Sequence, residues 1–317
     1  MTLEQTFTRN VPKPWGSSDL RPWNEHHLSG DPIGEVWFQR TDLDAPASAL
    51  LLKILFTTAA LSIQVHPDDA FAHSIGLAHG KSEAWYILSA QASARIALGL
   101  KRRVKPAELR TSIETGTITD LIQWRPVKAG DTLFVPAGTI HAIGPGLVLV
   151  EIQQRSEATF RLFDYGRERE LHVDHAVAAA RGEQAPRQAP LRKLTKERTL
   201  LVASPRFVIE RLELPPGSDW ELVAATETWL FVLKGGAWVG ILDARVNEAI
   251  VLEADSARVR VRTDGLSALL AYVGSDPIPT LLRSLEGQGA GLPNAQRERS
   301  LHDPQSPSVQ PVAQPQA

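Results

Sequence analysis

The segment that most constrains the fold of this chain is Gly130-Asp-Thr-Leu-Phe-Val-Pro-Ala-Gly-Thr-Ile-His141. Its opening Gly-Asp pair is a turn signal, and the β-branched and aromatic run that follows predicts a short strand over residues 132–135. The proline and glycine after this run break the strand, so we expect the next strand to begin near Thr139 and to carry His141. Because side chains alternate along a strand, His141 has a defined direction there. By itself it fits either a rigid metal ligand or a histidine of the core or a loop.

The spacing of this segment resembles the second motif of the cupin β-barrels, Gly-x5-Pro-x-Gly-x2-His. Gly130, Pro136, Gly138 and His141 match that motif in register, and Pro145 stands where it often ends in asparagine. The resemblance implies that the other metal ligands lie upstream, on a neighbouring strand of a barrel.

Composition limits what such a site can contain. The chain has 317 residues, 43% of them hydrophobic, so it can bury a sizeable core, and its length suggests about two domains. It contains no cysteine, which excludes disulfides and thiolate metal sites, so any transition metal must use histidine, carboxylate or amide ligands. Basic and acidic residues nearly cancel, 34 against 36, and no overall field favours nucleic acid or an anionic membrane. An anionic substrate would have to be held by a few local cations.

No targeting or membrane signal is visible in the sequence. The N-terminus lacks the basic and then apolar run of a signal peptide. The most apolar stretch, residues 49–65, is interrupted by Lys53 and is shorter than the roughly 20 residues of a membrane span. We therefore expect a cytoplasmic protein without a membrane partner, as a monomer or a weak homodimer.

Two segments upstream of His141 read as strands with polar groups inside apolar runs. Residues 50–56 form a continuous apolar run, which predicts a buried strand whose one charge, Lys53, must reach solvent or meet an anion. Residues 61–67 alternate, with Ser62, Gln64 and His66 on the face opposite the apolar residues. That polar face lines a cavity or faces solvent.

Other elements follow from local patterns. Pro67 and the acids after it predict a short helix, residues 103–122 predict a helical insertion, and residues 174–181 predict a further helix. Glu83 leads into a strand over residues 84–88. A strand over residues 147–153 places Leu149, Glu151 and Gln153 on one face.

The domain organisation is predicted from breaks in these patterns. We expect a metal-binding domain over residues 1–182, a proline-containing linker over 183–196, a second small β-domain over 197–285 and a disordered tail over 286–317. The only histidine after the linker is His302, in the tail, so the second domain cannot repeat a histidine metal site.

Gln64, His66, Glu83 and His141 then form a set of nitrogen and oxygen donors on strands or strand edges. One amide oxygen, two imidazoles and one carboxylate fit Zn²⁺ in an open catalytic site, and fit Mn²⁺ or Fe²⁺ less well.

Four segments together resemble type I mannose-6-phosphate isomerases, above all the short bacterial form. They are Gln64-Val-His-Pro-Asp-Asp69, Gly80-Lys-Ser-Glu-Ala-Trp-Tyr86, Val135-Pro-Ala-Gly-Thr-Ile-His-Ala142 and Glu151-Ile-Gln-Gln-Arg-Ser-Glu-Ala-Thr-Phe-Arg161. The resemblance covers about residues 10–170, and residues 196–285 only as a degenerate second cupin. It implies a mainly β fold, with a cupin (jelly-roll) catalytic barrel that has small helical insertions and a second cupin-like domain.

The resemblance also implies roles for individual residues. It implies one Zn²⁺ per chain on Gln64, His66, Glu83 and His141, an active-site arginine at Arg161, active-site positions at Lys81 and Glu151, and positions facing the sugar phosphate at Lys53 and Ser62. The sequence departs from the family pattern at Ser82, where Thr is usual, and at Glu157, where we expect Asp. The second departure puts a direct acid–base role for Glu157 in doubt.

The implied reaction interconverts mannose 6-phosphate and fructose 6-phosphate through an enediol. It needs an electrophile, a base and cations for a phosphorylated hexose. The sequence does not identify the base; Lys81 and Glu151 are the candidates, and we expect Lys81 to be neutral between Zn²⁺ and Arg161. For Arg161 itself the alternative is a structural ion pair with Asp164 or Glu157. Two other functions stay open: a cupin metal oxidoreductase and a non-catalytic module that binds a sugar phosphate.

Overall fold

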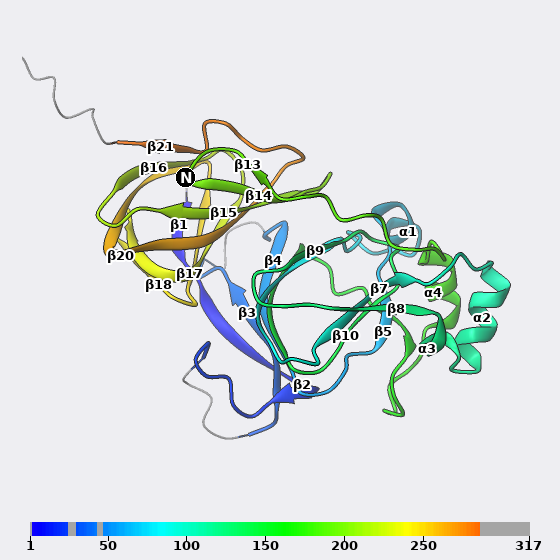
Figure 1. The fold of residues 1–317 in the computed structure, drawn as a ribbon. Coiled ribbons are helices and arrows are strands. Elements are labelled where there is room, and N and C mark those ends of the chain that lie inside the picture. Colours follow the sequence, from blue (N-terminus) through cyan, green and yellow to red (C-terminus); the bar gives the residue numbers. More distant parts are fainter. Residues whose placement is uncertain (1, 25–29, 43–46, 286–317) are drawn as a thin grey trace, which may run out of the picture.

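The computed structural model describes residues 2–24, 30–42 and 47–285. The predicted disordered tail at 286–317, with His302, lies outside the described residues. The expected mainly β architecture is confirmed, with two β-rich halves side by side and the helices at the far end of the N-terminal half (Figure 1).

The N-terminal half contains two antiparallel sheets. The six-stranded sheet has the order β2 (Phe7–Ser17), β3 (Ile33–Gln39), β4 (Leu50–Thr57), β11 (Leu147–Gln154), β6 (Glu83–Ala90), β9 (Thr132–Val135). The five-stranded sheet has the order β12 (Phe160–Phe163), β5 (Ile63–Val65), β10 (His141–Ile143), β7 (Arg95–Leu100), β8 (Ile122–Pro126). Apolar residues of both sheets, such as Leu149 and Ile96, share one core cluster, so the sheets face each other across a common interior.

The six-stranded sheet is buried on both faces, which explains the continuous apolar run of β4. Every residue of β4 is buried. Leu55 packs into the interior between the two sheets, whereas Leu52 and Ile54 point the other way, into a core shared with the C-terminal half. A strand enclosed on both sides has no solvent face, so its residues need not alternate between apolar and polar.

The predicted helices are present. They are α1 (Asp69–Ser74), α2 (Pro106–Glu114), α3 (Ile118–Leu121) and α4 (Val173–Ala179). Asp68 caps α1 by accepting a 2.9 Å hydrogen bond from the backbone N–H of Phe71. Residues of α2 to α4 cluster with Ile63 and Val65 of β5, so the helices cover the outer face of the five-stranded sheet and leave its inner face to the interior.

The C-terminal half is a ten-stranded antiparallel sheet. Its strands are β1 (Thr2–Gln5), β13 (Arg192–Lys193), β14 (Arg198–Ala203), β15 (Phe207–Leu214), β16 (Asp219–Ala224), β17 (Thr228–Val239), β18 (Leu242–Arg245), β19 (Ala249–Glu253), β20 (Asp255–Val273) and β21 (Leu282–Ser284). Two of these strands lie outside the range 197–285. β13 falls within the expected linker, and β1 pairs along β19 although residues 1–182 were expected to form one unit. The pairing with β1 covers an edge of β19 that would otherwise be open.

The two halves share one apolar core. Leu52 and Phe38 lie in the same cluster as Ile209 and Phe231, and the rings of Phe38 and Phe231 meet edge to face at 5.5 Å. Among the described residues, no helix has the length and apolar character needed to cross a membrane.

Candidate metal and substrate site

One row of side chains across the five-stranded sheet carries much of the candidate site. Gln64, in the middle of β5, is paired with His141 of β10 on one side and with Arg161 of β12 on the other. Directly opposite residues of antiparallel strands project to the same face, so all three side chains point to one side of the sheet. His66 follows β5 by one residue. The face predicted to carry Ser62, Gln64 and His66 therefore lies inside the barrel.

Glu83 reaches this row from the opposite sheet. It is the first residue of β6 and is fully buried. Its Oε2 lies 3.2 Å from Nε2 of His66, and its Oε1 lies 3.3 Å from Nε2 of His141. The donor atoms of these three residues all lie within 4.8 Å of one another.

Backbone carbonyls set the tautomer of both histidines. Nδ1 of His66 lies 2.7 Å from the carbonyl oxygen of Ala158, and Nδ1 of His141 lies 2.9 Å from that of Thr139. Since a carbonyl only accepts, Nδ1 carries the proton on each ring and the Nε2 lone pairs face Glu83. Burial, and then the charge of Lys81, lower the pKa of His66 to about 3, and burial lowers the pKa of His141. Both imidazoles are therefore neutral, as metal ligands must be.

The carboxylate of Glu83 fits a metal ion for a second reason. Within the described part of the chain neither of its oxygens accepts a hydrogen bond of normal geometry, although both are buried. A buried carboxylate that faces two imidazole lone pairs is costly, even with the ammonium group of Lys81 beside one oxygen, and a cation between the three groups would offset that cost. The donor set thus fits a divalent transition metal.

Gln64 presents its nitrogen, not its oxygen, to this centre. Nε2 lies 3.3 Å from Nε2 of His141, and Oε1 accepts a 3.1 Å hydrogen bond from Ser62. Ligation through Oε1 therefore requires a half-turn of the amide, after which Nε2 would donate to the Ser62 hydroxyl.

Lys81 stands beside Glu83. Its Nζ lies 2.8 Å from Oε2 of Glu83 and 3.2 Å from Nε2 of His66. Burial acts to lower the pKa of Lys81, but the negative charges of Glu83 and Glu151 outweigh burial and hold it above its usual value. The expectation of a neutral Lys81 concerns the zinc-loaded site and stays a prediction.

Lys53 forms buried ion pairs and does not reach solvent, which is one of the two arrangements expected from the sequence. Its Nζ lies 3.4 Å from Glu151 and 3.5 Å from Glu35, and it sits 4.7 Å from the ring centre of Trp37. Glu35 was not a predicted site residue. The sequence hint for it was that a lysine in a buried strand needs a negatively charged partner.

Glu151 is buried in the barrel next to Lys53. It accepts a 3.1 Å hydrogen bond from the indole N–H of Trp85. Burial first, and then the charge of Glu83, raise the pKa of Glu151, against the opposing effect of Lys81 and Lys53. The carboxyl group is thus shifted toward the proton-accepting range of a general base.

Arg161 forms no ion pair with any residue in the described ranges. Asp164, its expected structural partner, is held instead by Arg167 at 2.8 Å and Arg169 at 2.6 Å, and Glu157 is exposed. Nε of Arg161 is buried without a hydrogen-bond partner, and burial followed by the charge of Arg169 lowers its pKa. Its charge is therefore free to meet an anionic group in the barrel.

Gln153 is a further polar residue of the interior to which the sequence assigned no role. Of the nine buried side-chain atoms without a hydrogen-bond partner among the described residues, four belong to Glu83, Gln153 and Arg161. Such atoms are rare in native proteins, and these three residues lie on strands that line the barrel interior. The alternation of Leu149, Glu151 and Gln153 along one strand was the available signal.

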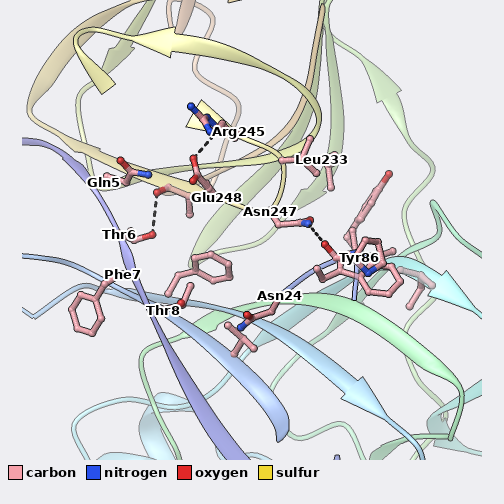
Figure 2. A pocket seen from close by; sticks show the side chains of 18 of the residues that line it. Gln5, Thr6, Phe7, Thr8, Asn24, Tyr86, Leu233, Arg245, Asn247 and Glu248 are labelled. Atoms are coloured by element: carbon pink, nitrogen blue, oxygen red, sulfur yellow. Dashed lines mark hydrogen bonds between the residues drawn. The ribbon is translucent and has the colours of Figure 1, made fainter. Parts of the chain in front are cut away.

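A separate groove of about 990 Å³ lies between the two halves (Figure 2). None of the predicted site residues lines it. Its charged groups interact with nearby groups of the same half: the backbone N–H of Arg245 donates to Glu248 at 2.9 Å, and the Arg245 guanidinium pairs with Asp243. Asn247 donates to the carbonyl of Pro22 across the groove at 3.1 Å. The groove holds no convergent set of titratable groups comparable to that of the barrel.

Comparisons with known proteins agree with the geometry. No protein-family profile matches the chain. The chain is 36% identical over 197 residues to the mannose-6-phosphate isomerase of Streptococcus mutans, a match that covers 58% of this chain and 62% of that protein. It is 40% identical over 160 residues to mannose-6-phosphate isomerase ManA of Bacillus subtilis, covering 47% of this chain and 50% of that protein. The matches thus span between half and two thirds of these relatives' own length.

Solved structures show the same fold over a longer range. A mannose 6-phosphate isomerase from Bacillus subtilis superposes with a TM-score of 0.74 at 23% identity, covering 86% of this chain and all (100%) of that one. A point mutant of the phosphomannose isomerase from Salmonella typhimurium superposes with a TM-score of 0.64 at 14% identity, again over 86% of this chain and 100% of the other. The resemblance to mannose-6-phosphate isomerases is confirmed. The chain shares the cupin-type fold of these structures over 86% of its length.

Proposed function

We propose that this chain is a zinc-dependent isomerase that interconverts mannose 6-phosphate and fructose 6-phosphate through an enediol. The observation that carries the proposal is the buried carboxylate of Glu83, whose two oxygens face the Nε2 lone pairs of His66 and His141 at 3.2 and 3.3 Å. The names of the sequence relatives support the substrate and the reaction.

His66, Glu83 and His141 would hold the ion, and Gln64 would join them after rotation of its amide. Two imidazole nitrogens with carboxylate and amide oxygens suit Zn²⁺ and leave room for an exchangeable ligand. A bound Zn²⁺ would act as a Lewis acid toward the oxygens on C1 and C2 of the sugar.

Three further residues are candidates for charge stabilisation and proton transfer. Arg161, which has no ion pair among the described residues, would stabilise negative charge as it develops on those oxygens. Glu151 and Lys81 are the candidate bases for the proton that moves between C2 and C1. The geometry favours Glu151, because the ammonium group of Lys81 lies 2.8 Å from Glu83 and serves as its counter-charge.

Lys53 and Ser62 are proposed to face the phosphate. Lys53 already lies between Glu35 and Glu151, and Ser62 already donates to Gln64. A bound phosphate would therefore replace the present partners of Lys53 and Ser62. Breaking the buried ion pairs of Lys53 is costly unless the phosphate takes the place of the carboxylates.

The decisive measurement is the turnover of mannose 6-phosphate by the purified protein before and after chelation, with Zn²⁺ added back. We expect activity to disappear with the metal and to return with zinc. His66→Ala should weaken zinc binding by about 100-fold or more, whereas the exposed His79→Ala should bind zinc like the parent protein.

The alternatives predict other results. Folded, zinc-loaded protein without turnover would contradict the isomerase and favour a module that only binds a sugar phosphate. Iron as the bound metal would favour an oxidoreductase. A location in the cytoplasm and a monomeric or weakly dimeric state stay predictions, and the oligomeric state can be checked by light scattering.

A further inference from the structure

Gln153 occupies a position in the barrel that adjoins the candidate metal centre. It lies near the end of β11, directly opposite Glu83 of β6 and Leu51 of β4, and it is fully buried. Directly opposite residues project to the same face with their Cβ atoms about 5 Å apart. The side chains of Gln153 and Glu83 are therefore neighbours on the inner face of the six-stranded sheet.

The hydrogen bonds of its amide nitrogen determine which end of Gln153 is available. Nε2 donates to the carbonyl of Gln154 at 3.0 Å and to that of Ser156 at 2.7 Å. A reversed amide would place Oε1 against two carbonyl oxygens, so the orientation is determined by its neighbours. Both protons are used, and Oε1 is left as an acceptor.

This acceptor has no donor within the described residues. Oε1 of Gln153 is buried without a hydrogen-bond partner. Burying an unpaired acceptor costs free energy, which a hydrogen-bonded ligand would recover. A metal ion accounts for the oxygens of Glu83, whereas a neutral amide oxygen calls for an O–H or N–H donor.

We propose that Gln153 is a substrate-binding residue whose Oε1 accepts a hydrogen bond from one hydroxyl group of a sugar phosphate in the barrel. The inference rests on the proposed function, since it takes the ligand to be a polyhydroxylated hexose phosphate. A buried acceptor left unpaired by a ligand without that hydroxyl discriminates strongly against such a ligand.

Calorimetric binding of mannose 6-phosphate and of its 2-, 3- and 4-deoxy analogues to the zinc-loaded protein tests the proposal. In the parent protein one analogue should bind about 10-fold more weakly than the others. In Gln153→Met that difference should vanish, because the acceptor is gone.

Gln154→Met is the matched control. The Gln154 side chain also takes part in two hydrogen bonds, with the backbone N–H of Ser82 and with Asp69, but it leaves no free oxygen in the barrel. The control should keep the analogue pattern of the parent protein even if its stability falls.

The proposal would be overturned if all analogues lost the same factor in affinity, in the parent protein as in Gln153→Met. It would also be overturned if Gln154→Met abolished the selective loss of affinity. If Gln153→Met does not fold, the affinities of the parent protein still test the proposal. Equal affinities for all three analogues would contradict a hydroxyl contact at this oxygen. Failure of the proposed function is distinguishable, because mannose 6-phosphate would then not be turned over by the parent protein.

Discussion

At the scale of single residues, the site depends on the direction and charge of a few buried groups. The alternation of residues 61–67 and the turn before His141 placed the two imidazoles correctly. The amide orientation of Gln64 and the carboxylate surroundings of Lys81 were not predictable in this way. Each depends in part on a group from a distant strand, His141 for the amide and Glu151 for the lysine.

Substitutions of the two candidate bases separate their roles. Glu151→Gln should lower kcat by about 10²–10⁴-fold, because a positioned base contributes that much to proton transfer. Lys81→Met should cost less in kcat, and zinc should bind at least as tightly as in the parent protein, because the substitution removes a positive charge that opposes the metal ion at Glu83 and His66. The measurements are steady-state kinetics and metal titration.

The exposed Glu157→Gln serves as the control and should stay near the parent values. A larger loss of kcat in Lys81→Met than in Glu151→Gln, with zinc affinity intact, would assign the base to Lys81 instead.

At the scale of elements, β4 connects the site to the C-terminal half. It carries Lys53 at its centre, and its first residues are held by Glu227, which lies just before β17. The carboxylate of Glu227 accepts hydrogen bonds from the backbone N–H of Ala49 at 2.6 Å and of Leu50 at 3.0 Å, and from the indole N–H of Trp229 at 2.7 Å. The strand itself was predictable from its apolar run, but this anchor was not, because its partners are separated by 178 residues.

Removing this anchor should destabilise the fold. Glu227→Ala leaves two buried donors, those of Leu50 and Trp229, without a partner, and we expect a loss of about 3 kcal/mol in the free energy of unfolding. Urea unfolding measures the change.

Glu221→Ala in the same half removes only the partly exposed ion pair with Arg283, so its change should stay within about 0.5 kcal/mol. Similar midpoints for the two variants would show that the anchor contributes nothing beyond a surface charge.

At the scale of the whole molecule, the two halves enclose one core between them. The outer face of the six-stranded sheet packs on the C-terminal sheet, and β1 adds a strand of the N-terminal chain to that sheet. The sequence predicted a mainly β fold, but the crossing of β1 and the shared core required the three-dimensional structure.

This arrangement predicts a single cooperative unfolding transition for both halves. Phe231→Ala, at the contact with Phe38, should lower the free energy of unfolding by about 3–5 kcal/mol through the cavity it creates. Because the halves share this core, loss of turnover and loss of β-structure should coincide on heating.

The partly exposed Trp238→Ala is the control and should shift the transition little. Two separate unfolding transitions, only one of which changes its midpoint in Phe231→Ala, would show that the halves unfold independently.

The sequence alone determined the elements of this protein and the kinds of atom at its centre. Alternation, turns and caps act over a few residues, so the strands around residues 64 and 141 and the helix after Asp68 could be derived from local patterns, whereas the His–Glu–His donor set came from the family resemblance of its motifs. The tertiary structure alone decided which charges meet and which atoms stay unpaired. Lys53 finds its carboxylates, Gln153 keeps a free oxygen and β1 joins the distant sheet because hydrogen bonding and electrostatics inside a barrel act over a few ångströms between strands far apart in the chain.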